Sequence, residues 1–108
     1  MSKIEVTATD LRTVIEILHK HLPTRKVVAF GSRVTGHAKR FSDLDLAILG
    51  DDPVPSSVLA ALADDFDEST LPFKVDLVDW ATTAESFRDV IRRDAIPLCH
   101  GEVGSSVG

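Results

Sequence analysis

The 108-residue sequence is poor in cysteine and contains no long hydrophobic segment. Its single cysteine, Cys99, excludes an internal disulfide and suits the reducing cytoplasm, where we expect it to be a small buried hydrophobic residue. No segment approaches the roughly 18 consecutive apolar residues that a membrane-spanning helix needs. The N-terminal stretch MSKIEVTATD has no apolar centre, so we expect no signal peptide.

Basic and aromatic residues are also scarce. Twelve Lys and Arg stand against 17 Asp and Glu, and the formal net charge of −5 disfavours direct binding to nucleic acid, which needs a basic surface. Aromatic residues make up only 6% of a chain that is 44% hydrophobic, so the core is expected to consist of Val, Leu, Ile and Ala. The length suits one domain, predicted over residues 1–100, with a small, polar and flexible tail over 101–108.

Hydrophobic periodicity predicts helices that alternate with strands. Strands are predicted over residues 26–30, 43–49, 73–79 and 95–99, with a short helix or loop over 33–39. A first helix, 10–21, is expected to start at a Thr7 or Thr9 cap and to stop before Pro23. Its apolar stripe consists of Leu11, Val14, Ile15, Leu18 and Leu22.

Two further helices are predicted from their caps. Ser56 is expected to cap a helix that ends near Asp67, and Thr82 with Glu85 forms a capping-box pattern for a helix that ends at residue 93 or 94. In the earlier helix the residues expected to face inward are Leu59, Leu62, Ala63 and Phe66, and those expected on a solvated face are Asp64, Asp65, Asp67 and Glu68. The four histidines are expected at the surface or in caps, not at a metal site.

The segment 30–46, FGSRVTGHAKRFSDLDL, is the most informative part of the sequence. Gly31 and Ser32 follow an apolar strand and form a tight turn where backbone N–H groups can approach a phosphate. Ten residues separate Ser32 from Asp43, and alternate residues of a strand share a face, so Asp43 and Asp45 project together. Paired carboxylates with oxygen-only ligation suit Mg²⁺. The alternative is a βαβ-like unit in which Ser42 is a cap and the aspartates are solvated.

A third carboxylate is expected in the strand FKVDLVD, residues 73–79. Alternation places Lys74, Asp76 and Val78 on one face. Asp76 lies in the middle of this apolar strand, where an unpaired carboxylate is costly to bury and coordination to a metal would remove the cost. Asp79 is the competing candidate, but at the end of the strand it is better suited to cap a turn.

These motifs resemble the nucleotidyltransferase superfamily of DNA polymerase β, and more narrowly the minimal nucleotidyltransferases (MNT proteins) of HEPN/MNT toxin–antitoxin modules. The resemblance covers roughly residues 10–100 and implies an α+β domain with a small mixed sheet and packed helices. It implies that Asp43, Asp45 and Asp76 hold two Mg²⁺ ions and that Gly31 and Ser32 hold the phosphates of ATP. Arg33 is a further candidate for binding the nucleotide. The roles of Lys39 and Arg40 stay open.

The sequence shows neither a basic stripe nor the added helical domain that supplies the acceptor in many superfamily members. We therefore expect the acceptor to come from another chain. By resemblance, that partner is a HEPN toxin, and the reaction is adenylylation of a toxin hydroxyl, expected to be a tyrosine, in the cytoplasm. Two alternatives remain: a non-catalytic antitoxin that only binds the toxin, and a nucleotidyltransferase for a small molecule or RNA whose acceptor site lies on another chain.

Overall fold

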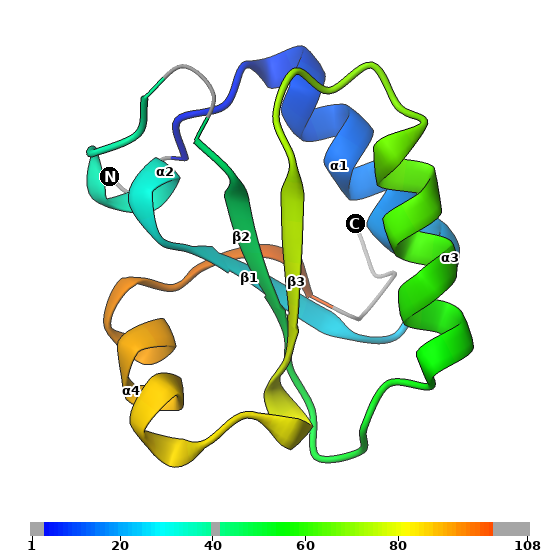
Figure 1. Cartoon of the computed structure of the whole chain (residues 1–108), viewed down its shortest axis with the longest axis vertical. Helices are drawn as coiled ribbons and strands as arrows, with labels where there is room; N and C mark the ends of the chain where they lie inside the picture. The colour runs from blue at the N-terminus through cyan, green and yellow to red at the C-terminus, as the bar shows by residue number, and fades with distance from the viewer. Residues whose placement is uncertain (1–3, 40–41, 101–108) are drawn as a thin grey trace.

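Four strands form one mixed sheet in the computed structural model, which describes residues 4–39 and 42–100 (Figure 1). The strands are β1 (Lys26–Phe30), β2 (Leu44–Ile48), β3 (Val75–Asp79) and β4 (Ile96–His100), and their order in the sheet is β3-β2-β1-β4. β1 runs antiparallel to both β2 and β4, whereas β2 and β3 are parallel. This arrangement confirms the predicted α+β fold with a small mixed sheet.

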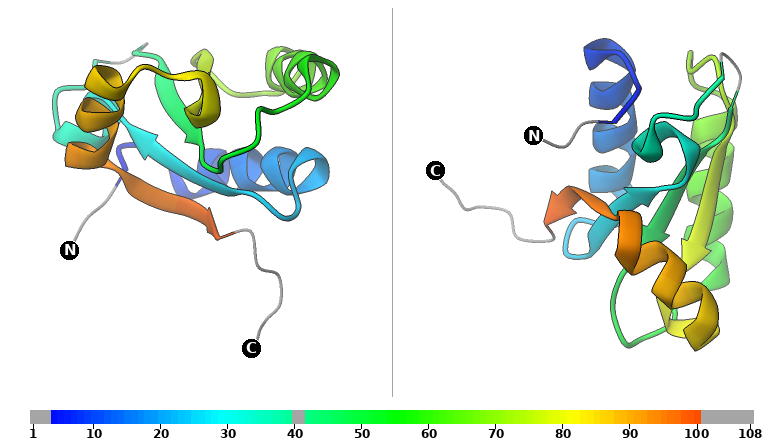
Figure 2. Two further views of the ribbon diagram at one scale, coloured as in Figure 1. Left: turned by 90° about the horizontal axis from the view of Figure 1, so that it is seen from below. Right: turned by 90° about the vertical axis from the view of Figure 1, so that its left-hand side faces the viewer.

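The helices cover the two faces of the sheet unequally (Figures 1 and 2). They are α1 (Ala8–His21), α2 (Ser32–Thr35), α3 (Ser56–Asp67) and α4 (Glu85–Asp94), together with the 3₁₀ turn η1 (Trp80–Thr82). α1 and α3 pack beside each other on one face, and α4 lies against the other. α3 is also the connection between the parallel strands β2 and β3, since such strands require a crossover.

The core has one layer on each side of the sheet. β1 separates the two layers: Val27 and Ala29 pack toward α1 and α3, and Val28 and Phe30 pack toward α4. Residues 27–30 of β1 are therefore buried on both faces of the sheet. The larger layer contains Val14 and Leu18 of α1, Leu44, Leu46 and Ile48 of β2, and Leu62 and Phe66 of α3.

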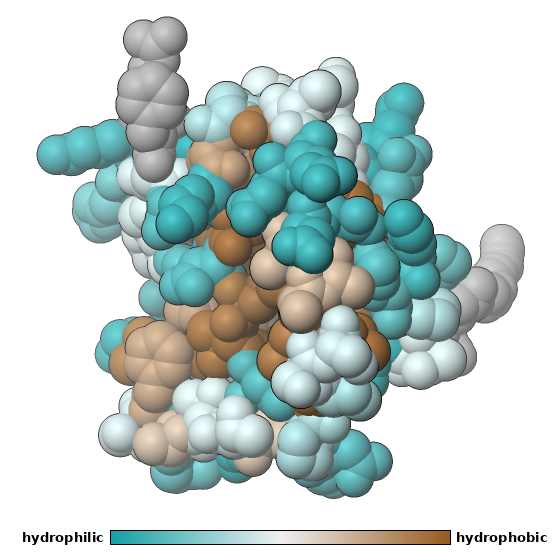
Figure 3. Space-filling view, turned by 45° about the vertical axis from the view of Figure 1, so that its right-hand side comes forward, coloured by the Kyte–Doolittle hydropathy of each residue, from teal (hydrophilic) through white to brown (hydrophobic). Residues whose placement is uncertain are grey.

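Some hydrophobic side chains also reach the surface of the molecule. In Figure 3 it forms a patch in the middle of the face shown, bordered above by hydrophilic side chains. The described residues include one large hydrophobic side chain with high exposure, Phe87 at 41%, whose ring meets Phe30 edge to face at 5.8 Å. None of the helices in residues 4–39 and 42–100 combines the length and hydropathy needed to cross a bilayer.

Several predicted caps differ from the structure. Thr7 does cap α1, since its Oγ1 accepts a hydrogen bond from Asp10 N at 3.1 Å. The Ser56 cap is wrong, because Pro55 precedes α3 and its carbonyl accepts the first backbone hydrogen bonds. The Thr82–Glu85 capping box is wrong as well: Thr82 lies in η1 and its hydroxyl donates to Asp79 O.

The acidic side of α3 is more ordered than expected. Asp65 is not merely solvated, because His21 Nε2 and Lys20 Nζ lie 2.6 and 3.2 Å from its Oδ2 and join α1 to α3. The hydrogen bonds from these two residues, first that from His21, lower the pKa of Asp65. Ala63, expected to face inward, is exposed. The predicted tail 101–108, Arg40, and the side chains of Cys99 and His100 lie outside the part of the chain that is described.

Candidate active site

Gly31 follows β1 and turns the chain into α2, of which it is the N-cap. Its φ of 85° and ψ of −159° belong to a region that residues with a side chain rarely adopt. Space imposes a second requirement, since a β-carbon at Gly31 would lie 3.2 Å from Asp45 Cγ and closer still to Oδ2. The turn and the Asp45 carboxylate are therefore in direct contact, although 14 positions separate Gly31 from Asp45 in the sequence. Only glycine satisfies both conditions here.

The three predicted acidic residues lie on adjacent parallel strands. Asp45 of β2 is in register with Asp76 of β3, and Asp43 directly precedes β2. By the alternation of strand residues, all three belong to the sheet face that also carries Val78 and Phe30, opposite the face that α1 and α3 cover. Asp45 is half-buried, whereas Asp43 and Asp76 are exposed. The structure thus places these carboxylates on one face of the sheet, with Asp45 beside the Gly31 turn.

Burial raises the pKa of Asp45, and the charges of Asp76 and Asp43 raise it further. The carboxylates consequently repel one another, and a cation between them would remove the repulsion. However, no group of three or more His, Cys, Asp or Glu side chains in residues 4–39 and 42–100 converges closely enough to hold a metal ion by itself. Mg²⁺ does not need such a cage, because it typically binds one or two carboxylates together with substrate phosphates and water. The oxygen-only donor set therefore fits Mg²⁺ that binds with a phosphorylated substrate.

Arg33 has a different position from that expected of a phosphate ligand. Its side chain is buried, with 7% exposure. Nε donates to Ser42 O at 2.9 Å, and Nη1 donates to Glu5 O at 2.7 Å. Its guanidinium also stacks 4.4 Å from the ring centre of Phe73. These contacts tie the N-terminal segment to the loops before β2 and β3, so they favour a structural role for Arg33.

Asp79 forms the turn contacts that its position predicted. It precedes η1, and its carboxylate accepts hydrogen bonds from Ala81 N at 3.3 Å and from Val54 N at 2.9 Å. The carboxylate therefore joins the end of β3 to the segment before α3. The turn role expected of Asp79 is thus confirmed, and Asp76 stays the predicted third acidic residue.

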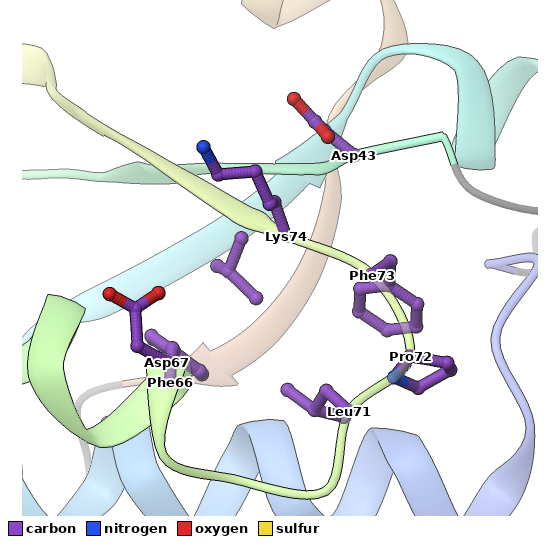
Figure 4. Close-up of a pocket in the computed structure, with 8 residues that line it drawn as sticks. Asp43, Phe66, Asp67, Leu71, Pro72, Phe73 and Lys74 are labelled. Carbon is purple, nitrogen blue, oxygen red and sulfur yellow. The ribbon is translucent and has the colours of Figure 1, made fainter.

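A pocket of about 380 Å³ adjoins Asp43 at the start of β3 (Figure 4). It is lined by Asp43, Phe66, Asp67, Leu71, Pro72, Phe73, Lys74 and Val75. Among these residues, Lys74 is a cation for which the sequence alone indicated no role. The alternation of residues in FKVDLVD already placed Lys74 on the same face as Asp76. The tertiary structure adds that Lys74 lies across from Asp43.

Comparison with known proteins gives concordant results. A model of the family described as polymerase beta, nucleotidyltransferase matches residues 12–101. The probable protein adenylyltransferase MntA of Haemophilus influenzae is 46% identical over 92 residues, which are 85% of this chain and 81% of that protein.

Two of the solved structures that are similar to this chain are toxin–antitoxins. One is a toxin–antitoxin with AMP-PNP, with a TM-score of 0.70 and 27% identity over 82% of this chain and 72% of the other. The second is a mutant MntA–HpeT toxin–antitoxin, with a TM-score of 0.68 and 25% identity over 82% and 71%.

Proposed function

The chain belongs to the polymerase β nucleotidyltransferase family, and from this premise we propose that it transfers AMP from ATP to a tyrosine hydroxyl of a HEPN toxin, for which it is the antitoxin. One observation carries the proposal: the Gly31 turn packs directly on Asp45, which is in register with Asp76. An element suited to hold phosphate and an element suited to hold a cation are thereby neighbours. Because the reaction consumes ATP, we also propose that it takes place in the cytoplasm.

The proposed roles follow from the position of each residue. The backbone of Gly31 and the hydroxyl of Ser32 would hold the β- and γ-phosphates, since N–H and O–H groups donate well to phosphate oxygens. Asp43, Asp45 and Asp76 would hold two Mg²⁺ ions, which when bound supply the positive charge that an anionic triphosphate needs in order to approach an acidic face.

Asp76 lies on β3, at the edge of the sheet and away from the Gly31 turn. An acceptor can therefore reach it from outside the sheet. We propose that its carboxylate takes the proton of the acceptor hydroxyl. The hydroxyl oxygen then forms the bond to the α-phosphorus, and the bond to pyrophosphate breaks with its electron pair on the leaving oxygen. Holding the reactants in line would supply much of the rate enhancement.

A protein acceptor is supported by the relatives. The similar curated protein is named an adenylyltransferase, and both solved structures are toxin–antitoxin assemblies. The net charge of −5 would also favour association with a basic, RNA-cleaving partner. A non-catalytic antitoxin that only masks the toxin is the second candidate, and the acidic charge of the chain favours it equally, because binding to a basic partner needs no transfer.

The mass of the intact partner toxin distinguishes these functions. After incubation with wild-type protein, ATP and Mg²⁺, we expect the toxin to gain one or more adenylyl groups, and we expect no gain with Asp45→Asn. Asp79→Asn is the matched control, because it removes a carboxylate from β3 outside the proposed site and should keep most of the activity. Tight binding with no mass change, in wild type and Asp45→Asn alike, would establish the non-catalytic antitoxin instead. Label on a small molecule or an RNA, with the toxin unbound, would overturn both antitoxin functions.

A further inference from the structure

Lys74 lies at the edge of the acidic face, across from Asp43. The register that pairs Leu44 with Val75 makes Asp43 and Lys74 neighbours one position earlier, and Leu44 N donates to Lys74 O at 2.9 Å. In Figure 4 the amine of Lys74 and the carboxylate of Asp43 extend to the same side of their strands. Strand alternation places Lys74 on the same face as Asp76. One cationic side chain thus borders the three carboxylates.

The Lys74 side chain is exposed and takes part in no ion pair within residues 4–39 and 42–100. Other cations of the described chain are used to hold the fold: Arg33 by the carbonyls of Glu5 and Ser42, and Lys20 by Asp65. Lys74 is therefore available to bind a ligand. Because acidic side chains surround it, an anionic ligand can approach only together with cations.

The Gly31 turn and Lys74 lie on opposite sides of β2. Gly31 follows β1 and contacts Asp45, whereas Lys74 precedes β3. Adjacent strands are separated by about 4.8 Å, so roughly 10 Å separates β1 from β3. A triphosphate whose terminal phosphates lie at the Gly31 turn would extend across β2, and its α-phosphate would come within reach of the long Lys74 side chain.

We propose that Lys74 binds the α-phosphate of the nucleoside triphosphate, on the side from which the acceptor approaches. This inference rests on the proposed function of the same site. Even with two divalent ions, a triphosphate and three carboxylates leave the site negatively charged, and an ammonium group donates up to three hydrogen bonds to phosphate oxygens. Lys74 keeps its proton during the transfer, and the proton of the acceptor goes to Asp76.

Titration of the 108-residue chain with α,β-methylene-ATP and Mg²⁺ tests this contact without turnover, because the bond between the α- and β-phosphates that would break is replaced. We expect Lys74→Met to weaken binding by about ten- to a hundredfold, the loss of a charge-assisted hydrogen bond. Lys74→Arg retains the charge and should stay within about threefold of wild type. The matched control is Lys26→Met, which neutralises an exposed lysine at the far end of β1 and should leave affinity unchanged.

Wild-type affinity in Lys74→Met would overturn the inference. So would an equal loss in Lys74→Arg and Lys74→Met, because a contact with phosphate depends on the charge. Circular dichroism checks that each variant is folded, and the exposed position of Lys74 makes a folding defect unexpected. The proposed function can fail separately: if wild type binds the analogue and Lys74→Met does not, yet the toxin gains no mass with ATP, then the phosphate contact stands and transfer to the toxin is refuted.

Discussion

Gly31→Ala is the substitution for which the structure makes the most specific prediction. Two effects act together at this position. The backbone has φ 85° and ψ −159°, a conformation that alanine adopts only under strain. The added methyl group would also occupy the space of Asp45 Oδ2, which would have to move. The substitution should therefore reduce both the stability of the fold and the activity of the site.

The expected loss of stability can be estimated from the backbone. A residue forced into such a conformation costs about 1–3 kcal/mol. For a domain of this size, 1 kcal/mol corresponds to roughly 4–8 °C in Tm, so a Tm lower by about 5–20 °C is expected. Much of the steric overlap can be relieved by rotation of the Asp45 carboxylate, because Oδ2 is the end of a side chain. That rotation moves a proposed metal ligand, so the transfer rate should fall even at temperatures where the variant is fully folded.

Gly36→Ala provides the matched control. Gly36 also has a positive φ, 87°, and ends α2 in the left-handed conformation. An alanine at position 36 would cost about 1–2 kcal/mol in backbone energy. Its β-carbon would meet only Glu5 Oε2 at 3.5 Å, which is an ordinary contact. Both variants should thus be destabilised, but only Gly31→Ala should lose activity.

Thermal unfolding followed by circular dichroism measures the first effect, and initial rates of toxin adenylylation, below the lower Tm, measure the second. A Gly31→Ala protein with the Tm and the rate of wild type would refute the contact between the turn and Asp45. If Gly36→Ala lost as much activity as Gly31→Ala, then general instability, and not the position of Asp45, would explain the loss.

Three further predictions concern single side chains. Asp45→Asn should abolish transfer but raise the Tm of the free protein at neutral pH. The pKa of Asp45 is raised in the folded state, so ionisation of this carboxyl opposes folding. The gain in Tm should therefore disappear as the pH falls through the folded-state pKa toward the ordinary value of 3.8. Arg33→Met should lower the free energy of unfolding by about 2 kcal/mol, because the buried guanidinium and its hydrogen bonds to the carbonyls of Glu5 and Ser42 are lost. Arg93→Met, at an exposed position, should not, and equal denaturation midpoints for the two variants would contradict the structural role of Arg33. Asp79→Asn should lower the Tm, because the hydrogen bond from Val54 N is weakened, and should keep most of the activity. A variant that is stable but inactive would instead make Asp79 the third acidic ligand.

The sequence indicated much of the site because its key relations are local. Alternation along a strand requires Asp43 and Asp45 to share a face, and Gly31 with Ser32 marks a turn wherever the rest of the chain lies. The same alternation placed Asp76 on one face of its strand, together with Lys74 and Val78. That all three carboxylates belong to one site was inferred by resemblance, and the register of β2 with β3 brings them together in the structure.

The misplaced caps show where local reasoning stops. Ser56 and Thr82 have the side chains of helix caps, but Pro55 and Ala84 precede the helices. Thr82 instead donates to Asp79 O, whose strand ends there. Short polar residues can satisfy several nearby backbone groups, and tertiary packing selects among them.

The sequence by itself determined the elements, the two faces of each strand and the chemistry of the carboxylates, because these depend on covalent geometry and on neighbours a few residues away. Only the tertiary structure decided that Arg33 holds backbone carbonyls, that His21 pairs with Asp65, and that Lys74 lies across from Asp43. Each of these relations joins segments that are distant in sequence or on different elements. A long polar side chain can reach several partners in rotamers of similar free energy. The packing of helices and strands around the core determines which of these partners is near.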